Sequence, residues 1–302
     1  MNIVITGGTG FVGRPLCATL VRAGHRVRVT SRDPARAAAR LPGEVEIVCP
    51  SSPGAWADAV RGADAVINLA GESIADGRWT ARRKQALRQS RILMTRSIVE
   101  ACRDLGSPPP VLVSASAIGY YGSRGDELID ETAPPGSDFL AQLCVDWESE
   151  ALRAAEFGMR VVLPRIGVVL GDGGGALQRM VPPFRAFVGG PLGSGRQWMS
   201  WVHRLDVVAL LVEAIENERM FGPINATAPD PRTMKDFSQA LGAALRRPSW
   251  IPVPALALRL ALGEMAGMLL TGQRVVPAAA EAAGFRFCYP ILGDALAEIL
   301  HR

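Results

Sequence analysis

The sequence predicts an α/β protein with a doubly wound parallel sheet and a smaller C-terminal lobe. Short apolar or β-branched runs alternate with helical segments through the first two-thirds of the chain, which is typical of strands buried on both faces of a parallel sheet. A glycine-rich turn follows the first of these runs. With 302 residues, 48% of them hydrophobic and 21% charged, the chain is large and apolar enough to bury a sizeable core.

The runs that are expected to form strands define the sheet. Each run is short and apolar, and a helical segment or turn separates it from the next. One helix is expected at Arg14–Ala23, with Gly24 as the residue that ends it in a left-handed conformation. The expected strands are Asn2–Thr6, His25–Thr30, Val45–Cys49, Ala65–Leu69, Val111–Ser114 and Arg160–Leu163.

The pattern loosens from about Gly171. Glycine and proline cluster in residues 171–175 and 189–195, and a helix-rich section follows Pro229. We therefore expect a dinucleotide-type domain over residues 1–222, with segments from about residue 171 contributing to a second lobe. Residues 223–302 are expected to form a small helix-rich domain.

Composition excludes several classes of function. The net charge of +4 comes from arginines scattered along the chain, so no nucleic-acid partner is expected. Five cysteines lie far apart without a CxxC pair, which predicts neither a disulfide framework nor a metal site. The apolar stretch from Ala255 to Leu270 contains Arg259 and Glu264 and is too short to span a bilayer. We expect a cytoplasmic monomer or homodimer that binds a small molecule and no membrane.

The glycine-rich turn reads Thr6-Gly7-Gly8-Thr9-Gly10-Phe11-Val12-Gly13 and opens a helix directly after the first strand. Gly7 suits a tight turn, Gly10 allows the backbone to approach a pyrophosphate, and Gly13 allows close packing of helix on sheet. The helix N-terminus supplies free N–H groups for phosphate. This context predicts a Rossmann dinucleotide-binding fold.

The end of the second strand indicates which dinucleotide is bound. An NAD-binding protein places an acid there to accept from the ribose 2′-hydroxyl, whereas this chain has Ser31-Arg32. A hydroxyl and a guanidinium suit a 2′-phosphate, because arginine binds phosphate with charge-assisted hydrogen bonds. The cofactor predicted is NADP(H) rather than NAD(H). The alternative is that Arg32 is simply a solvated surface residue.

The chain resembles the extended, epimerase/dehydratase-like branch of the short-chain dehydrogenase/reductase superfamily. The resemblance rests on Asn68–Gly71, on Ser114–Gly122 and on the segment Trp201–Asp206. The chain resembles most closely the atypical "epimerase family protein" subgroup, which has a small extra C-terminal domain. Segments typical of that subgroup are Arg78–Thr80, Ser90–Ile92, Asp138–Leu140, Gly189–Gly195, Asn225–Pro229 and Trp250–Phe285.

The resemblance implies further contacts to the cofactor. In addition to Gly7, Gly10, Gly13, Ser31 and Arg32, the matching positions are Phe11, Val12, Leu69, Ala70, Arg91 and Val169. For the substrate, the matching loop offers Arg196 for an anionic group and Trp198, with Trp201, as an aromatic wall. The alternative places both tryptophans in the core. His203 is a further substrate candidate, and its alternative role is to anchor the helix that carries Asp206.

The chemistry typical of the superfamily is missing. Its Tyr-x-x-x-Lys motif needs a tyrosine that moves a proton and a lysine that lowers the pKa of that tyrosine. This chain has three tyrosines and two lysines, Lys84 and Lys235, and no tyrosine has a lysine four residues later. The aligned pair is Phe139 and Leu143 or else Leu140 and Cys144, and neither pair can replace the motif.

Other residues must then carry any proton transfer. Ser116 matches the superfamily's serine position, unless a one-residue shift puts Ala117 there, and Tyr120 lies just beyond; both are expected catalytic residues. Asp146 and Glu148 are expected to face solvent or to anchor packing rather than to act as an acid–base pair, and Glu131 is expected to be a cap or loop ligand rather than a base. The predicted function is that of an NADP(H)-binding epimerase or oxidoreductase acting on a small polar substrate of the nucleotide-sugar kind. The alternative is a non-catalytic NADP(H)-binding sensor or partner-binding protein.

Overall fold

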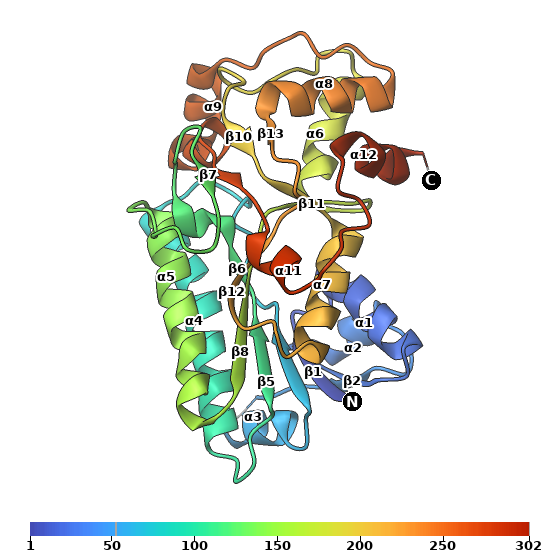
Figure 1. Ribbon diagram of the computed structural model, residues 1–302, viewed down its shortest axis with the longest axis vertical. Helices are drawn as coiled ribbons and strands as arrows, with labels where there is room; N and C mark the ends of the chain where they lie inside the picture. Colours follow the sequence, from blue (N-terminus) through green and yellow to red (C-terminus); the bar gives the residue numbers. More distant parts are fainter. Residues whose placement is uncertain (52, 302) are drawn as a thin grey trace.

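A computed structural model describes residues 1–51 and 53–301. A parallel sheet runs through the centre of the larger lobe, with strand order β12-β8-β5-β4-β1-β2-β3 (Figure 1). The short strand β6, Ser116–Ala117, pairs with β8 beside β5. The sheet strands are β1 Asn2–Thr6, β2 Arg26–Thr30, β3 Glu46–Val48, β4 Ala65–Asn68, β5 Val111–Ser114, β8 Arg160–Ile166 and β12 Gly222–Ala226. All of their pairings are parallel, as predicted.

Helices cover both faces of this sheet. Alternate residues of each strand face opposite sides, so Ile3 and Ile5 join the core on one face while Val4 joins the core on the other. The first face packs against α1, Gly13–Arg22, and α7, Arg204–Glu216, on the right in Figure 1. The second packs against α3 Pro53–Val60, α4 Ala81–Arg103 and α5 Phe139–Leu152. The doubly wound prediction is therefore confirmed.

Local signals set the ends of several of these elements. Gly24, with φ of 82°, follows the C-cap of α1 and turns the chain back toward β2. The short helix α2, Pro34–Ala38, begins where the Asp33 carboxylate accepts from the Arg36 backbone N–H at 3.0 Å. Each of the six predicted strands is present, and β8 continues beyond its predicted end, to Ile166.

The smaller lobe has its own core, which includes the buried side chains of Trp201, Phe237 and Leu296. Its helices are α6 Gly175–Arg185, α8 Met234–Leu245, α9 Ala255–Leu262, α10 Gly267–Leu270 and α12 Leu292–Leu300. Its short strands pair as β9 Val168–Leu170 with β11 Trp201–His203, and as β10 Trp198–Met199 with β13 Arg232–Thr233. Trp201 is therefore a core residue, and its interpretation as a pocket wall is wrong.

The two lobes are interleaved along the chain. β12 begins at Gly222 and is part of the main sheet, so the predicted division at residue 222 falls at the start of a Rossmann strand. Near the C-terminus, β14 Arg274–Val275 returns to pair with β7 Leu128–Ile129, and α11 Ala278–Ala282 lies beside β12. Within the described residues, no helix is both long and apolar enough to cross a bilayer.

Candidate functional site

The glycine-rich turn forms a cradle with no room for side chains. Gly7 has φ of 72°, and a Cβ there would lie 2.6 Å from the Leu69 carbonyl oxygen at the end of β4. A Cβ on Gly13 would lie 2.3 Å from the Gly7 carbonyl oxygen, and one on Gly10 would lie 3.1 Å from the same atom. No side chain caps the N-terminus of α1. The Arg14 N–H donates to the Gly10 carbonyl at 3.1 Å and Pro15 has no N–H, so the Gly13 N–H is the first helical donor available to a ligand.

Phe11 and Val12, in the same turn, pack against protein. The Phe11 ring lies against the backbone of Gly174 and Gly175, where a Cβ would come within 2.7 Å of ring carbons. The Arg204 guanidinium lies 4.9 Å from the centre of the ring on another side. Val12 packs against the sheet core, as does Val169 of β9. Phe11 therefore joins the cradle to the loop that opens the smaller lobe.

The end of β2 presents an unpaired cation. Arg32 is exposed and forms no ion pair or hydrogen bond with its side chain within residues 1–51 and 53–301. The neighbouring Asp33 carboxylate is already engaged in capping α2. The Ser31 hydroxyl donates to the Asp33 carbonyl at 3.0 Å, which holds the tight turn after the strand. Nothing acidic therefore competes with a phosphate for the Arg32 guanidinium.

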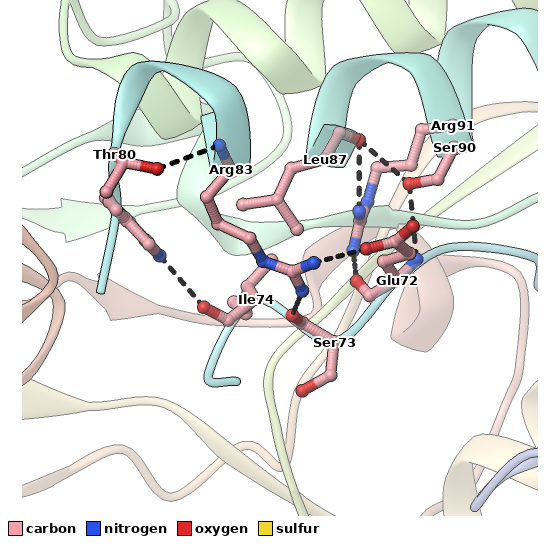
Figure 2. Close-up of polar contacts among 9 residues, drawn as sticks. Glu72, Ser73, Ile74, Thr80, Arg83, Leu87, Ser90 and Arg91 are labelled. Carbon is pink, nitrogen blue, oxygen red and sulfur yellow. Dashed lines mark hydrogen bonds and ion pairs between the residues drawn. The ribbon is translucent and has the colours of Figure 1, made fainter. Parts of the chain in front are cut away.

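A second cation faces the end of β4 from helix α4 (Figure 2). The Arg91 guanidinium donates to the carbonyl oxygens of Glu72 at 2.9 Å and Leu87 at 3.2 Å. It lies 3.1 Å from the position of a Cβ on Gly71, immediately beyond Leu69 and Ala70. Burial lowers its pKa below the ordinary value for arginine.

The carboxylate nearest to Arg91 is already used. Glu72 pairs with Arg83, which also donates to the Ser73 carbonyl at 2.6 Å and so ties the loop after β4 to the first turn of α4. In the part of the chain that is described, Arg91 has no carboxylate in ion-pair contact. Arg91 is therefore a half-buried charge, 5.3 Å from the centre of the Trp147 ring, without a carboxylate partner in these residues.

The position of the missing Tyr-x-x-x-Lys is settled by which face of α5 approaches the sheet. A Cβ on Gly119 would lie 3.3 Å from Leu140 Cβ and 4.0 Å from Cys144 Sγ. Phe139 instead packs edge-on against Trp79, with ring centroids 5.4 Å apart. The aligned pair is thus Leu140 and Cys144. Burial raises the pKa of the Cys144 thiol to about 12, so this position carries neither a cation nor a proton donor at neutral pH.

One turn further along the same face of α5 lies Glu148, which forms the centre of a buried polar network. The Ser116 hydroxyl donates to Glu148 Oε1 at 2.6 Å. Arg165 binds the same carboxylate with two hydrogen bonds, Nε to Oε1 at 2.9 Å and Nη2 to Oε2 at 2.8 Å. Ser116, Glu148 and Arg165 are 3%, 6% and 3% exposed. Glu148 is therefore a buried anchor, one of the two roles expected for it.

Arg165 was not singled out by sequence reasoning, yet it connects this network to both tyrosines. Its guanidinium carbon lies 3.5 Å from the centre of the Tyr120 ring, and its Nη1 donates to the Tyr121 hydroxyl at 3.0 Å. Tyr121 is buried, and its hydroxyl donates to Asn225 Oδ1 at 2.7 Å. Burial raises the pKa of Tyr121 to about 12. The half-buried Tyr120 is thus better placed than Tyr121 to meet a ligand.

The predicted substrate residues differ in their surroundings. Arg196 is exposed, and Trp198 is half-buried, with its indole N–H donating to Asp126 at 2.7 Å. His203 is 2% exposed and caps α7 through Nδ1, which accepts from the Leu205 N–H at 3.2 Å. Its Nε2 lies 3.0 Å from Glu298. Both ring nitrogens of His203 already have protein partners, which supports the anchoring role.

Two family models match this chain. A model of the NAD dependent epimerase/dehydratase family matches residues 3–226. The chain belongs to this family. Residues 253–299 match a second model, a domain of unknown function called DUF1731, which confirms the resemblance to epimerase family proteins with an extra C-terminal domain. The described residues contain no group of three or more metal-ligating side chains.

Relatives in the family match over nearly the whole chain. The chain is 44% identical to the epimerase family protein SDR39U1 homolog, chloroplastic, of Arabidopsis thaliana, over 99% of this chain and 87% of that protein. It is 39% identical to the epimerase family protein YfhF of Bacillus subtilis, over 99% and 98% of the two chains. The crystal structure of human epimerase family protein SDR39U1 (isoform 2) with NADPH matches with a TM-score of 0.90, 34% identity and complete coverage of both chains.

Proposed function

We propose that this protein binds NADP(H) in the glycine cradle and uses it on a small polar substrate of the nucleotide-sugar kind. The observation that carries the proposal is the cradle itself, where Cβ atoms on Gly7 and Gly13 would overlap backbone atoms. A dinucleotide pyrophosphate needs such a close backbone approach. The NADPH bound to the human relative supports the choice of cofactor.

Arg32 supports NADP(H) over NAD(H). It is exposed, lies at the end of β2 and pairs with no carboxylate in the described residues, so a 2′-phosphate can accept from it. Arg91, at the end of β4, is placed to balance a further negative charge of the cofactor. In this proposal residues 1–222 hold the dinucleotide, and residues from about 171 onward form the substrate side, in a cytoplasmic protein.

The bound nicotinamide would supply or accept a hydride. The chain's own contribution at the substrate is set by Ser116 and Tyr120. Because the Ser116 hydroxyl donates to Glu148, its oxygen can offer a substrate only its lone pairs, and so it accepts a hydrogen bond. Tyr120 is held by the Arg165 guanidinium against its ring, and its hydroxyl is the proposed proton-transferring group.

A second function is favoured by one specific observation. The α5 side chains nearest to Gly119, at the position of the missing motif, are Leu140 and Cys144, which cannot move protons at neutral pH, and Glu148 on the same face is held by Arg165. This favours a non-catalytic protein that binds NADP(H) and senses it or recruits a partner. Incubation with NADPH and a panel of keto-sugars, or with NADP⁺ and a panel of sugar nucleotides, decides between the two. Turnover that is reduced in Ser116→Ala and Tyr120→Phe supports the enzyme, and rates unchanged in both variants contradict this site.

The cofactor proposal is tested by the affinities for NADPH and NADH, measured by titration calorimetry. We expect wild-type protein to prefer NADPH, and Arg32→Ala to lose about tenfold to a hundredfold in NADPH affinity with little change for NADH. Arg26→Ala, at the opposite end of the same strand, is the matched control. Equal affinities of the wild type for the two nucleotides would refute the assignment of Arg32.

A further inference from the structure

The end of the smaller lobe carries a cluster of exposed apolar side chains. Trp250 is 76% exposed, and Leu256 and Leu260, both on α9, are each 68% exposed. α9 has the sequence ALALRLAL, yet none of its residues is buried. We call this surface the apolar tip, and it comprises Phe187, Val188, Trp250, Ile251, Leu256 and Leu260.

Two segments that lie far apart in the chain meet in the apolar tip. The Ile251 N–H donates to the Gly189 carbonyl at 3.3 Å, which joins the loop before α9 to the loop after α6. The Arg247 guanidinium carbon lies 4.5 Å from the centre of the Phe187 ring. Figure 1 shows α8, α9 and their connecting loop together at one end of the long axis, away from the start of the sheet strands. The two loops and α9 therefore lie at the same end of the molecule.

The surroundings of the tip are positively charged. The sequence contains no aspartate or glutamate from residue 173 to 205 or from residue 237 to 263. Arginines 185, 246, 247 and 259 lie in these stretches, and none pairs with a carboxylate in the part of the chain described by the structure.

The acids that bound these stretches are already engaged. Asp172 pairs with Arg204, and Glu264 pairs with Lys84. Asp206 accepts from the backbone N–H groups of Cys288 and Tyr289, and Asp236 accepts from the Thr233 hydroxyl. The tip therefore combines projecting tryptophan, phenylalanine and leucine side chains with unneutralised arginines.

We propose that the apolar tip binds the surface of an anionic lipid bilayer. Apolar side chains with aromatic residues, beside arginines, are the combination that enters the interfacial layer of a membrane, and the arginines complement anionic headgroups. A second copy of this chain would bring the same unpaired guanidinium groups face to face. A fluid bilayer takes up projecting side chains without a matching shape, which a folded protein partner would need.

This contact lies on the membrane surface and requires no spanning helix. The expectation of no membrane partner rests on the length and charge of residues 255–270. Those properties exclude a helix that crosses the bilayer but say nothing about binding to its surface. The site also differs from the proposed cofactor site, so it stands or falls independently of NADP(H) binding.

The test is cosedimentation of the full chain with phosphatidylcholine vesicles that contain or lack phosphatidylglycerol. We expect binding at least about tenfold stronger to the anionic vesicles, and weaker binding as salt is added. Leu256→Glu and Leu260→Glu should each abolish it, while Arg259→Gln should reduce the preference for anionic vesicles. The matched control is Phe221→Glu, because Phe221 is 70% exposed but lies before β12, outside the tip.

Three outcomes would overturn the proposal. One is no binding to anionic vesicles, or equal binding to neutral ones. Another is a concentration-dependent dimer in sedimentation equilibrium that Leu256→Glu dissociates, which would assign the tip to a second copy. The third is tighter binding of a synthetic Glu- and Leu-rich amphipathic peptide than of vesicles, which would assign it to an acidic protein partner. Unchanged thermal melting of the variants shows that they remain folded.

Discussion

Replacing Glu148 by glutamine should destabilise the protein strongly, because it leaves a buried cation unpaired. Glu148 accepts from Arg165 at 2.8 and 2.9 Å and from Ser116 at 2.6 Å. Glutamine keeps one acceptor oxygen but turns an N–H group toward the guanidinium donors. Removing one partner of a buried pair typically costs about 3–5 kcal/mol. For a chain of this size that corresponds to a fall in melting temperature of about 5–8 °C.

The assay is thermal unfolding followed by circular dichroism at constant pH and salt. Asp146→Asn is the matched control, since Asp146 lies on the same helix and pairs with Arg88 at 2.5 Å, with side chains 28% and 40% exposed. A partly exposed pair contributes about 0–1 kcal/mol, so the control should melt within about 2 °C of wild type. The double variant Glu148→Leu/Arg165→Met should be more stable than Glu148→Leu alone, because no unpaired charge remains buried. If Glu148→Gln melts within about 2 °C of the control, the reasoning is refuted.

Three further predictions concern the cradle, a buried histidine and the thiols. Gly7→Ala should abolish NADPH binding. Gly24→Ala should leave the NADPH affinity unchanged, because Gly24 also has a positive φ but a Cβ there would have no atom within 4 Å. Loss of binding in both variants would contradict a steric cradle. Burial lowers the pKa of His203 below 6.5, so the unfolded chain binds a proton more readily and the free energy of unfolding should fall as pH drops through about 6.5. His203→Asn, which retains a capping side chain, should lose that part of the slope in urea titrations at several pH values, and equal slopes would contradict it. Native protein should react with Ellman's reagent mainly at Cys49 and Cys288, which are exposed. The other three thiols should react slowly, because burial raises their pKa to about 12. Rapid reaction of all five cysteines would show that the core is open.

The sheet and its cofactor loop follow from local signals. Six apolar runs gave six strands of one parallel sheet, and Gly24 ended α1 as expected, because strand burial and glycine conformation leave their pattern within a few neighbouring residues. The last strand of the sheet, β12, was not foreseen. Its segment Gly222–Ala226 contains proline and asparagine and does not stand out as a run of apolar residues.

The candidate site was predictable only in part. The cradle and Arg32 follow from spacing, but two alignments of the missing catalytic pair were equally consistent with the sequence. The rotation of α5 against the sheet selected Leu140 and Cys144, since those two side chains lie nearest to Gly119. The same rotation brings Glu148 to Ser116, and its partner Arg165 comes from β8, a separate strand.

By itself, the sequence determined a doubly wound nucleotide-binding fold, an arginine at the 2′ end of the expected cofactor and the absence of Tyr-x-x-x-Lys. These depend on residue identity at short spacing, which the chain carries locally. The tertiary structure decided which residues occupy the vacant catalytic position, which buried charges pair, and which apolar segments remain exposed at the end of the smaller lobe. Those outcomes depend on how helices and strands far apart in the chain pack together, and packing alone determines which side chains are buried and which meet solvent.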